Sequence, residues 1–122
     1  LGTHDFSVTK PDKVNSWSLG GTWRVGSEGI TAVKDSVVVL RYAARDVYLV
    51  TGSDKTATIE VLLDGKPISE SNAATEDISG SKLKVSMASL YKLVHYDSMN
   101  NAATVELRVP AGVQLNTFTF GG

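Results

Sequence analysis

Hydrophobic and polar residues alternate along most of this chain, and the alternation is clearest between Ser36 and Gly65. A period of two, in runs rich in β-branched and aromatic residues, is typical of half-buried strands. The stretch therefore predicts three consecutive strands, separated by a short link at residues 43–46 and a turn at residues 52–55. We expect these strands to form a meander, which must be covered by the rest of the chain because its faces are apolar.

The same pattern predicts further strands on both sides of this stretch. The segment Trp17–Val25 is predicted as a strand that is interrupted at Gly20-Gly21 by a bulge or bend. A long polar loop is predicted over residues 66–81, anchored by Ile68 and Ile78. Shorter alternating runs cover residues 30–33, 82–86, 90–96, 104–109 and 115–120. With about eight or nine strands and no convincing helix, the predicted fold class is all-β, an antiparallel β-sandwich of the jelly-roll type.

The pattern also predicts where the domain begins and which side chains form its core. Residues 1–16 are polar and weakly periodic, so we expect a linker or an arm laid against the domain, which spans residues 17–122. The expected core consists of Leu40, Tyr42, Leu49, Ile59, Val61, Leu93, Val105, Leu107, Phe118 and Phe120.

Composition and charge exclude several classes of function. The chain has 122 residues, of which 42% are hydrophobic and 20% charged, with a formal net charge of −1. That balance gives no basic footprint for nucleic acid, and no apolar run approaches the roughly 18 residues of a membrane span. The chain contains no cysteine, which excludes disulfides and thiol chemistry within it. It starts at Leu1 instead of Met, so we expect an excised domain or a processed product.

Candidate catalytic chemistry is sparse. His95 is the only imidazole in the centre of the chain, and no GxSxG motif, metal-spaced histidine cluster or phosphate-binding glycine loop accompanies it. One histidine does not make a triad, so we expect a structural or exposed role for His95, no catalytic residues, no metal ligands and no cofactor.

A set of motifs resembles a known family. The segments WSLGGTWRVGSEGITA, LRYAARDVYLVTG, IEVLLDGKPI, SLYKLV and VPAGVQLNTFTFGG occur in one order between residues 17 and 122. Together they resemble the C-terminal domain of DipZ-type proteins, the CcdA/thioredoxin fusions of thiol-disulfide exchange and cytochrome c biogenesis. The resemblance implies a jelly roll similar to carbohydrate-binding modules, placed after a thioredoxin-like domain and located outside the cytoplasm as part of a membrane-anchored parent.

Aromatic rings are the residues with which such a jelly roll would bind a ligand. Rings that stack on sugar faces give a large contact area, and neighbouring polar groups fix the orientation of the sugar. We take Trp17, Trp23, Tyr48 and Tyr91 as candidate ligand-binding residues, although large rings often belong to the core. The acidic and amide side chains at Glu76-Asp77 and residues 97–101 have no recognisable calcium-loop spacing, and solvated turns are the simpler explanation.

Two functions from different classes follow from these observations. The first is a non-catalytic accessory domain that docks to the thioredoxin-like domain of its parent or to another envelope protein. The alternative is a carbohydrate-binding module for a cell-envelope glycan. Neither involves nucleic acid or direct insertion into a membrane. Exposed, coplanar rings would favour the glycan, and buried rings a docking or structural role.

Overall fold

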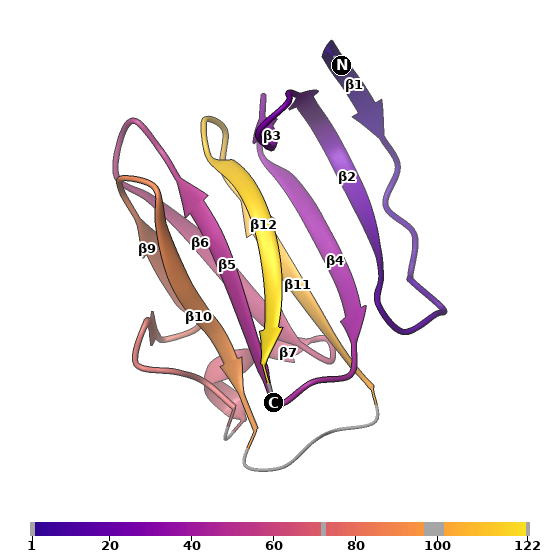
Figure 1. Ribbon diagram of the computed structural model, residues 1–122, viewed down its shortest axis with the longest axis vertical. Coiled ribbons are helices and arrows are strands. Elements are labelled where there is room, and N and C mark those ends of the chain that lie inside the picture. The colour runs from indigo at the N-terminus through magenta and orange to yellow at the C-terminus, as the bar shows by residue number, and fades with distance from the viewer. Residues whose placement is uncertain (1, 72, 97–101, 122) are drawn as a thin grey trace.

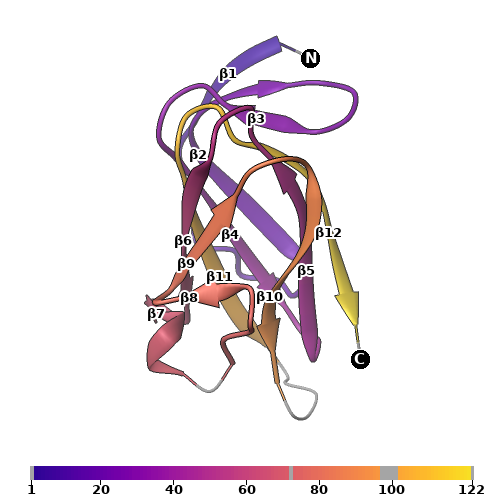
Figure 2. The same cartoon turned by 90° about the vertical axis from the view of Figure 1, so that its left-hand side faces the viewer.

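Two antiparallel sheets face each other across an apolar core in the computed structural model, which describes residues 2–71, 73–96 and 102–121 (Figures 1 and 2). Strand β2 belongs to both sheets, because its first half pairs in one sheet and its second half in the other. The first sheet has the order β10-β5-β12-β3-β2-β1, with β10 Ser89–His95, β5 Asp46–Gly52, β12 Gln114–Gly121, β3 Ile30–Ala32, β2 Ser16–Val25 and β1 Gly2–Phe6. The second has the order β2-β4-β11-β6-β9-β8, with β4 Ser36–Tyr42, β11 Ala103–Val109, β6 Ala57–Leu63, β9 Lys82–Val85 and β8 Ile78–Ser79.

The predicted class, an antiparallel all-β sandwich, is confirmed, but the described residues form twelve strands where about eight or nine were expected. The additional strands are short. β7 (Lys66–Pro67) and β8 lie in the predicted polar loop, together with the one-turn 3-10 helix η1 (Ile68–Glu70). Strands β3, β12, β5 and β10 of the first sheet face β4, β11, β6 and β9 of the second. From β3 to β6 and again from β9 to β12, each strand lies in the opposite sheet from the one before it. This order supports the jelly-roll assignment.

The predicted meander is wrong in its pairing, although its three strands are where the alternation placed them. β4 pairs with β2 and β11, β6 pairs with β11, β7 and β9, and β5 pairs with β10 and β12 in the other sheet. The three strands therefore make no ladder with one another. Local alternation specifies a strand and its buried face, but the partner of that strand is decided by contacts far away in the sequence.

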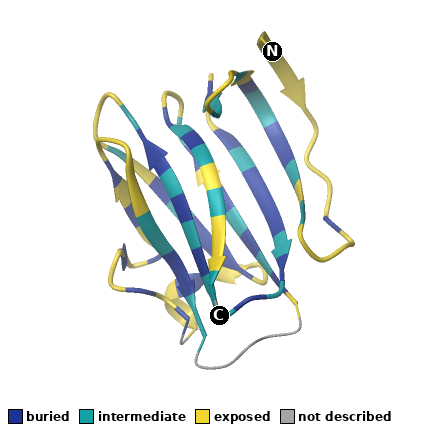
Figure 3. Cartoon of the chain, viewed as in Figure 1, coloured by how far each residue is buried: buried dark blue, intermediate teal, exposed yellow. Residues whose placement is uncertain are grey.

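The predicted core is buried except at its C-terminal end. All of its members on β4, β5, β6, β10 and β11 are at most 4% exposed. Phe118 is half-buried against the core, whereas Phe120 is 44% exposed, so its assignment to the core is wrong. Figure 3 shows the exposed part of β12 among the buried strands.

The segment 1–16, predicted as a linker or arm, carries β1, which pairs with β2 from Gly2↔Val25 to Phe6↔Gly21. Beyond β1 the chain stays close to β2, because the Thr9 N–H donates a hydrogen bond to Ser18 Oγ over 2.9 Å. The arm thus covers one side of β2, while the division of the chain after residue 16 stays a prediction.

The double glycine of β2 marks the point at which the strand changes sheets. Residues 16–20 pair with β4, and residues 21–25 pair with β1 and β3. Gly21 has φ +94°, a backbone conformation that glycine adopts without steric penalty, and a Cβ there would lie 2.9 Å from Ser36 Cα. A Cβ at Gly20 would lie 2.7 Å from a side-chain carbon of Val37 and 2.8 Å from Val8 Cβ. The bend predicted from the sequence is therefore present, and both of its positions leave little room for a side chain.

We expect Gly21→Ala to lower the free energy of unfolding by about 2–4 kcal/mol, because the new Cβ adds a backbone collision to the strain of a positive φ. Gly112→Ala is the matched control, since Gly112 also has φ +94° but has nothing within 4 Å of the added atom. The control isolates the strain, about 1–2 kcal/mol. Urea denaturation of both variants measures the difference, and equal losses would contradict the role given to the close approach.

Candidate functional site

An open apolar cavity of about 440 Å³ lies between the two sheets at one side of the sandwich, and we call it the aromatic slot. Its apolar walls are formed mainly by Trp17, Leu19, Leu40, Leu115, Phe118 and Phe120. Three polar side chains, Asn15, Asn116 and Thr117, also line it. One wall therefore belongs to the first half of β2 and to β4, and the opposite wall to β12.

The slot is open because β12 has a partner along one edge only. On the side away from β5, β3 pairs with Gln114 and Leu115 and with no later residue of β12. The ladder with β5 shifts its register between Leu115 and Thr117 and continues to Gly121. At this point the Asn116 amide donates a hydrogen bond to the Glu28 carbonyl over 3.0 Å, which fixes the β2–β3 turn at the end of the slot.

Two rings of the slot are exposed although they lie on inward-facing sides of their strands. Phe120 is directly opposite Val47, which is fully buried, and Trp17 is directly opposite the buried Leu40. Trp17 is nevertheless 60% exposed, and Phe120 is exposed while its ring stacks on Tyr42 with centroids 6.0 Å apart. These are the exposed large side chains at the slot, and solvent reaches them because the sheets do not close there.

The four aromatic residues proposed from the sequence do not form one site. Trp17 lines the slot, but Trp23 is fully buried, and its indole N–H donates to the Gly20 carbonyl over 3.0 Å. Trp23 is therefore a core residue that holds the bend of β2. Tyr48 and Tyr91 are half-buried on β5 and β10, where neither lines the slot.

The sequence reasoning missed Phe118 and Phe120 as slot residues. Both were assigned to the core, because an alternating Phe-Thr pattern predicts an inward face and the structure does place them on it. An uncharged run with two phenylalanines at the end of the last strand was the available signal. That signal could not reveal that β12 has no described partner on the β3 side after Leu115.

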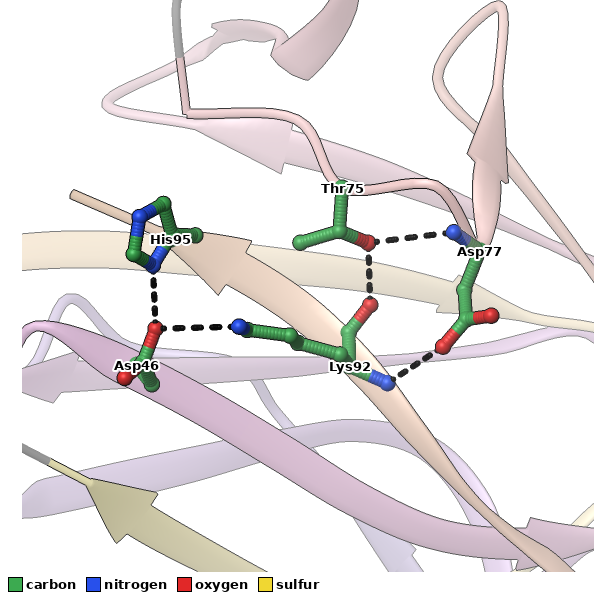
Figure 4. Close-up of polar contacts among 5 residues, drawn as sticks. All are labelled: Asp46, Thr75, Asp77, Lys92 and His95. Atoms are coloured by element: carbon green, nitrogen blue, oxygen red, sulfur yellow. Dashed lines mark hydrogen bonds and ion pairs between the residues drawn. The ribbon is translucent and has the colours of Figure 1, made fainter. Parts of the chain in front are cut away.

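A charged cluster connects the ends of β5 and β10 on the other side of the first sheet (Figure 4). Asp46 Oδ1 lies 2.5 Å from His95 Nδ1 and 3.5 Å from Lys92 Nζ. A carboxylate can only accept, so Nδ1 of His95 carries the proton of this hydrogen bond. Lys92 also lies over the ring of Tyr48, with its Nζ 5.7 Å from the ring centroid. The hydrogen bond from His95 is the main reason why the pKa of Asp46 is lowered from its ordinary value, and Lys92 adds to the effect.

This cluster holds strands together, in agreement with the structural or exposed role expected for His95. The backbone N–H of His95 donates to the Ala73 carbonyl over 2.9 Å, and its side chain is 42% exposed. The contacts join β10 to β5 and to the loop before β8.

A larger groove of about 740 Å³ lies on the outer face of the second sheet, and part of its charged floor is already paired. Arg108 contacts Glu60 over 3.0 Å and Glu106 over 3.1 Å, which joins β11 to β6. Because these charges satisfy one another at the surface, the groove offers a ligand less unsatisfied chemistry than the aromatic slot does.

In the part of the chain that the structure describes, no group of three or more acidic or imidazole side chains could hold a metal ion. Of the acidic segments considered from the sequence, residues 97–101 lie outside the described residues. At Glu76-Asp77, Asp77 Oδ2 accepts the backbone N–H of Lys92 over 2.8 Å. Among the described residues no helix is long and apolar enough to cross a membrane.

Two facing antiparallel sheets with an aromatic slot at their side define an all-β sandwich domain. The chain belongs to the family described as "Thioredoxin like C-terminal domain", whose model matches residues 1–121. It is 35% identical over 121 residues to the protein DipZ of Mycobacterium bovis and to that of Mycobacterium tuberculosis. The match covers 98% of this chain and 15% of each DipZ protein, so the chain spans a small part of these relatives. The family predicted from the motifs is confirmed.

Similar solved structures share the fold. A family two carbohydrate esterase from Clostridium thermocellum in complex with cellohexaose matches with a TM-score of 0.68 and 19% identity, over 87% of this chain and 31% of the esterase. An active-site mutant of a family two carbohydrate esterase from the same organism matches with a TM-score of 0.69 and 19% identity, over 88% of this chain and 32% of that chain.

The lowered pKa of Asp46 makes the cluster sensitive to acid. A carboxyl group whose pKa is lower in the folded than in the unfolded state stabilises the fold above its unfolded pKa, about 3.9, and this stabilisation is lost as the pH falls through the lowered value. We expect Asp46→Asn to be less stable than the unmodified chain at neutral pH, and the difference to disappear in acid.

Denaturant unfolding at a series of pH values measures this difference. Carboxyl NMR titration of His95→Gln and Lys92→Met separates the two causes, and His95→Gln should raise the pKa of Asp46 more. A stability difference that does not change with pH would contradict the interpretation.

Proposed function

We propose that this chain is a non-catalytic docking domain, and that its aromatic slot contacts the thioredoxin-like domain of its own parent protein. The observation that carries the proposal is the exposure of Trp17 and Phe120 at the mouth of an apolar cavity. Apolar side chains that gather on a concave surface are typical of sites where another molecule is bound. The family supports this choice of partner, because its description is that of the C-terminal domain of a thioredoxin-like protein and the chain matches 15% of DipZ.

The energy available at Trp17 is sufficient for it to act as an anchor. Trp17 is 60% exposed, so docking could remove roughly 150 Å² of its side chain from water. At about 25 cal/mol per Å² that burial corresponds to about 3–4 kcal/mol. An exposed ion pair such as Arg108–Glu60 contributes only about 0–1 kcal/mol, so the slot and not the charged surface would dominate docking.

The absence of cysteine from the chain favours an accessory, non-catalytic role within a redox protein. Thiol-disulfide exchange must therefore come from another part of the parent. We further infer that the domain lies outside the cytoplasm as part of a membrane-anchored protein of the cell envelope, because its relatives are DipZ proteins.

Intrinsic fluorescence tests docking directly, because the chain has two tryptophans of opposite exposure. Trp23 is buried and Trp17 exposed, so adding the parent's thioredoxin-like domain should shift the emission of Trp17 to shorter wavelength. Trp17→Ala should remove the shift and weaken docking by about 2 kcal/mol or more, the scale of an interface anchor.

Met87→Ala is the matched control, because Met87 is 77% exposed and does not line the slot. It should dock like the unmodified chain. The absence of any shift with the partner at about 1 mM, the concentration that half-saturates a complex of roughly −4 kcal/mol, would refute the proposal.

A glycan in the same slot is the second candidate, and the polar side chains beside the rings favour it. Asn15, Asn116 and Thr117 could bracket a sugar that stacks on Trp17. The esterase structures with the same fold include one in complex with cellohexaose. Their 19% identity carries the fold and not the ligand, so we rank this candidate second.

Calorimetric titration with cello-oligosaccharides and peptidoglycan fragments decides between the candidates. We expect no saturable binding below about millimolar concentration, because no charged side chain among the described residues lines the slot and the Asn116 amide already donates to the Glu28 carbonyl. Saturable binding that disappears in Trp17→Ala would place the glycan first. Trp23→Ala is unsuitable for this test, since removing a fully buried Trp costs about 3–5 kcal/mol of stability.

A further inference from the structure

Two open strand edges in the first sheet, that of β10 and that of β12 after Leu115, differ in how their backbone is protected. At the β10 edge the N–H of Lys92 donates to Asp77 and its carbonyl accepts from the Thr75 hydroxyl, as Figure 4 shows. Ala74 forms a bridge with Val94 at the same edge. The loop before β8 therefore covers this edge, which is how folded proteins prevent a free strand from pairing with another chain.

The edge of β12 beside the aromatic slot has no such cover. From Thr117 to Gly121 the strand pairs with β5, and no described strand pairs with it on the side of the slot. Its residues Thr117, Phe118, Thr119 and Phe120 include neither a charge nor a proline. An uncharged edge that is rich in β-formers is a template for a further strand.

A single added β-strand would occupy both the slot and the open edge of β12. A strand placed beside β12 would satisfy the open backbone groups of β12 and would direct alternate side chains inward, because successive side chains point to opposite faces. Its inward side chains would enter the slot against Trp17 and Phe120, and its outward ones would lie beside Thr119. A sugar or a rigid helix could fill the slot but would leave the backbone edge open.

We propose that an extended segment of the parent's thioredoxin-like domain, of about five residues with apolar side chains at alternate positions, adds to the first sheet as a strand beside β12. The inference rests on the docking function proposed above and specifies how docking occurs. A partner in the same polypeptide is favoured over a second copy because tethering gives it a high local concentration, and this chain makes up 15% of its DipZ relatives.

Amide hydrogen exchange of the isotopically labelled chain, with and without the unlabelled thioredoxin-like domain, tests the strand directly. In a strand paired on one side, alternate backbone N–H groups point to the open edge. We expect every second amide between Thr117 and Gly121 to exchange at least about tenfold more slowly when the partner is present, because each becomes hydrogen-bonded.

A pair of variants separates strand addition from contact with the slot. Thr119→Lys places a charge on the free edge without altering the slot walls, and should weaken docking about tenfold, as edge lysines do in natural sheets. Thr58→Lys is the control, because Thr58 is also exposed but lies on β6 in the second sheet, away from β12 and the slot. It should leave docking unchanged.

Several results would overturn the inference. A Trp17 fluorescence shift with unchanged exchange at residues 117–121, or equal docking of Thr119→Lys and Thr58→Lys, means docking without strand addition and leaves the proposed function standing. If neither the fluorescence shift nor the amide protection is observed, both proposals are refuted. Protection of the same amides by dimerisation of the isolated chain, seen by light scattering, identifies a second copy as the occupant, and saturable binding of cello-oligosaccharides without such protection identifies a glycan.

Discussion

The passage of β2 from one sheet to the other at Gly20-Gly21 is the constraint on which the rest of the structure depends. The bend places Trp23 in the core, where its indole hydrogen-bonds the Gly20 carbonyl, and leaves Trp17 on the other half of the strand. β3 pairs with β12 at Gln114 and Leu115 only, so β12 has no described partner on that side after Leu115. The slot lies between this part of β12 and the first half of β2, which the bend places in the opposite sheet.

Sequence patterns predicted the strands and the class of fold well, because alternation reports directly which face of a strand is buried. Ile59 and Val61 on β6, and Val105 and Leu107 on β11, are buried as the pattern requires. The order of the strands could not be obtained in this way, and the meander expected between Ser36 and Gly65 proved to be three strands with other partners. Pairing depends on contacts between residues far apart in the sequence, on which a local period carries no information.

The binding residues were predicted less well for a related physical reason. Aromatic residues occur both in cores and at binding surfaces, so a local pattern does not distinguish Trp17 from Trp23. Trp17 is 60% exposed, whereas Trp23 is 0% exposed. Phe120 illustrates the converse error. Its inward orientation was predicted correctly, but inward residues are buried only where the facing sheet extends far enough to cover them. The exposure of a ring at a sandwich edge is therefore a property of topology.

Electrostatic and apolar features occupy different parts of this molecule, and the separation bears on function. The charged groups pair within the domain: Asp46 with His95 and Lys92 across β5 and β10, and Arg108 with Glu60 and Glu106 across β11 and β6. Those contacts are complete without a partner. The slot differs, because two of its rings are exposed and no described strand pairs with the adjoining edge of β12 after Leu115. Burial of rings and pairing of backbone groups both gain most when water is excluded from them. The edge of β10 is protected by Thr75 and Asp77, whereas β12 after Leu115 has no described partner beside the slot, so a partner strand there would gain both kinds of contact at once.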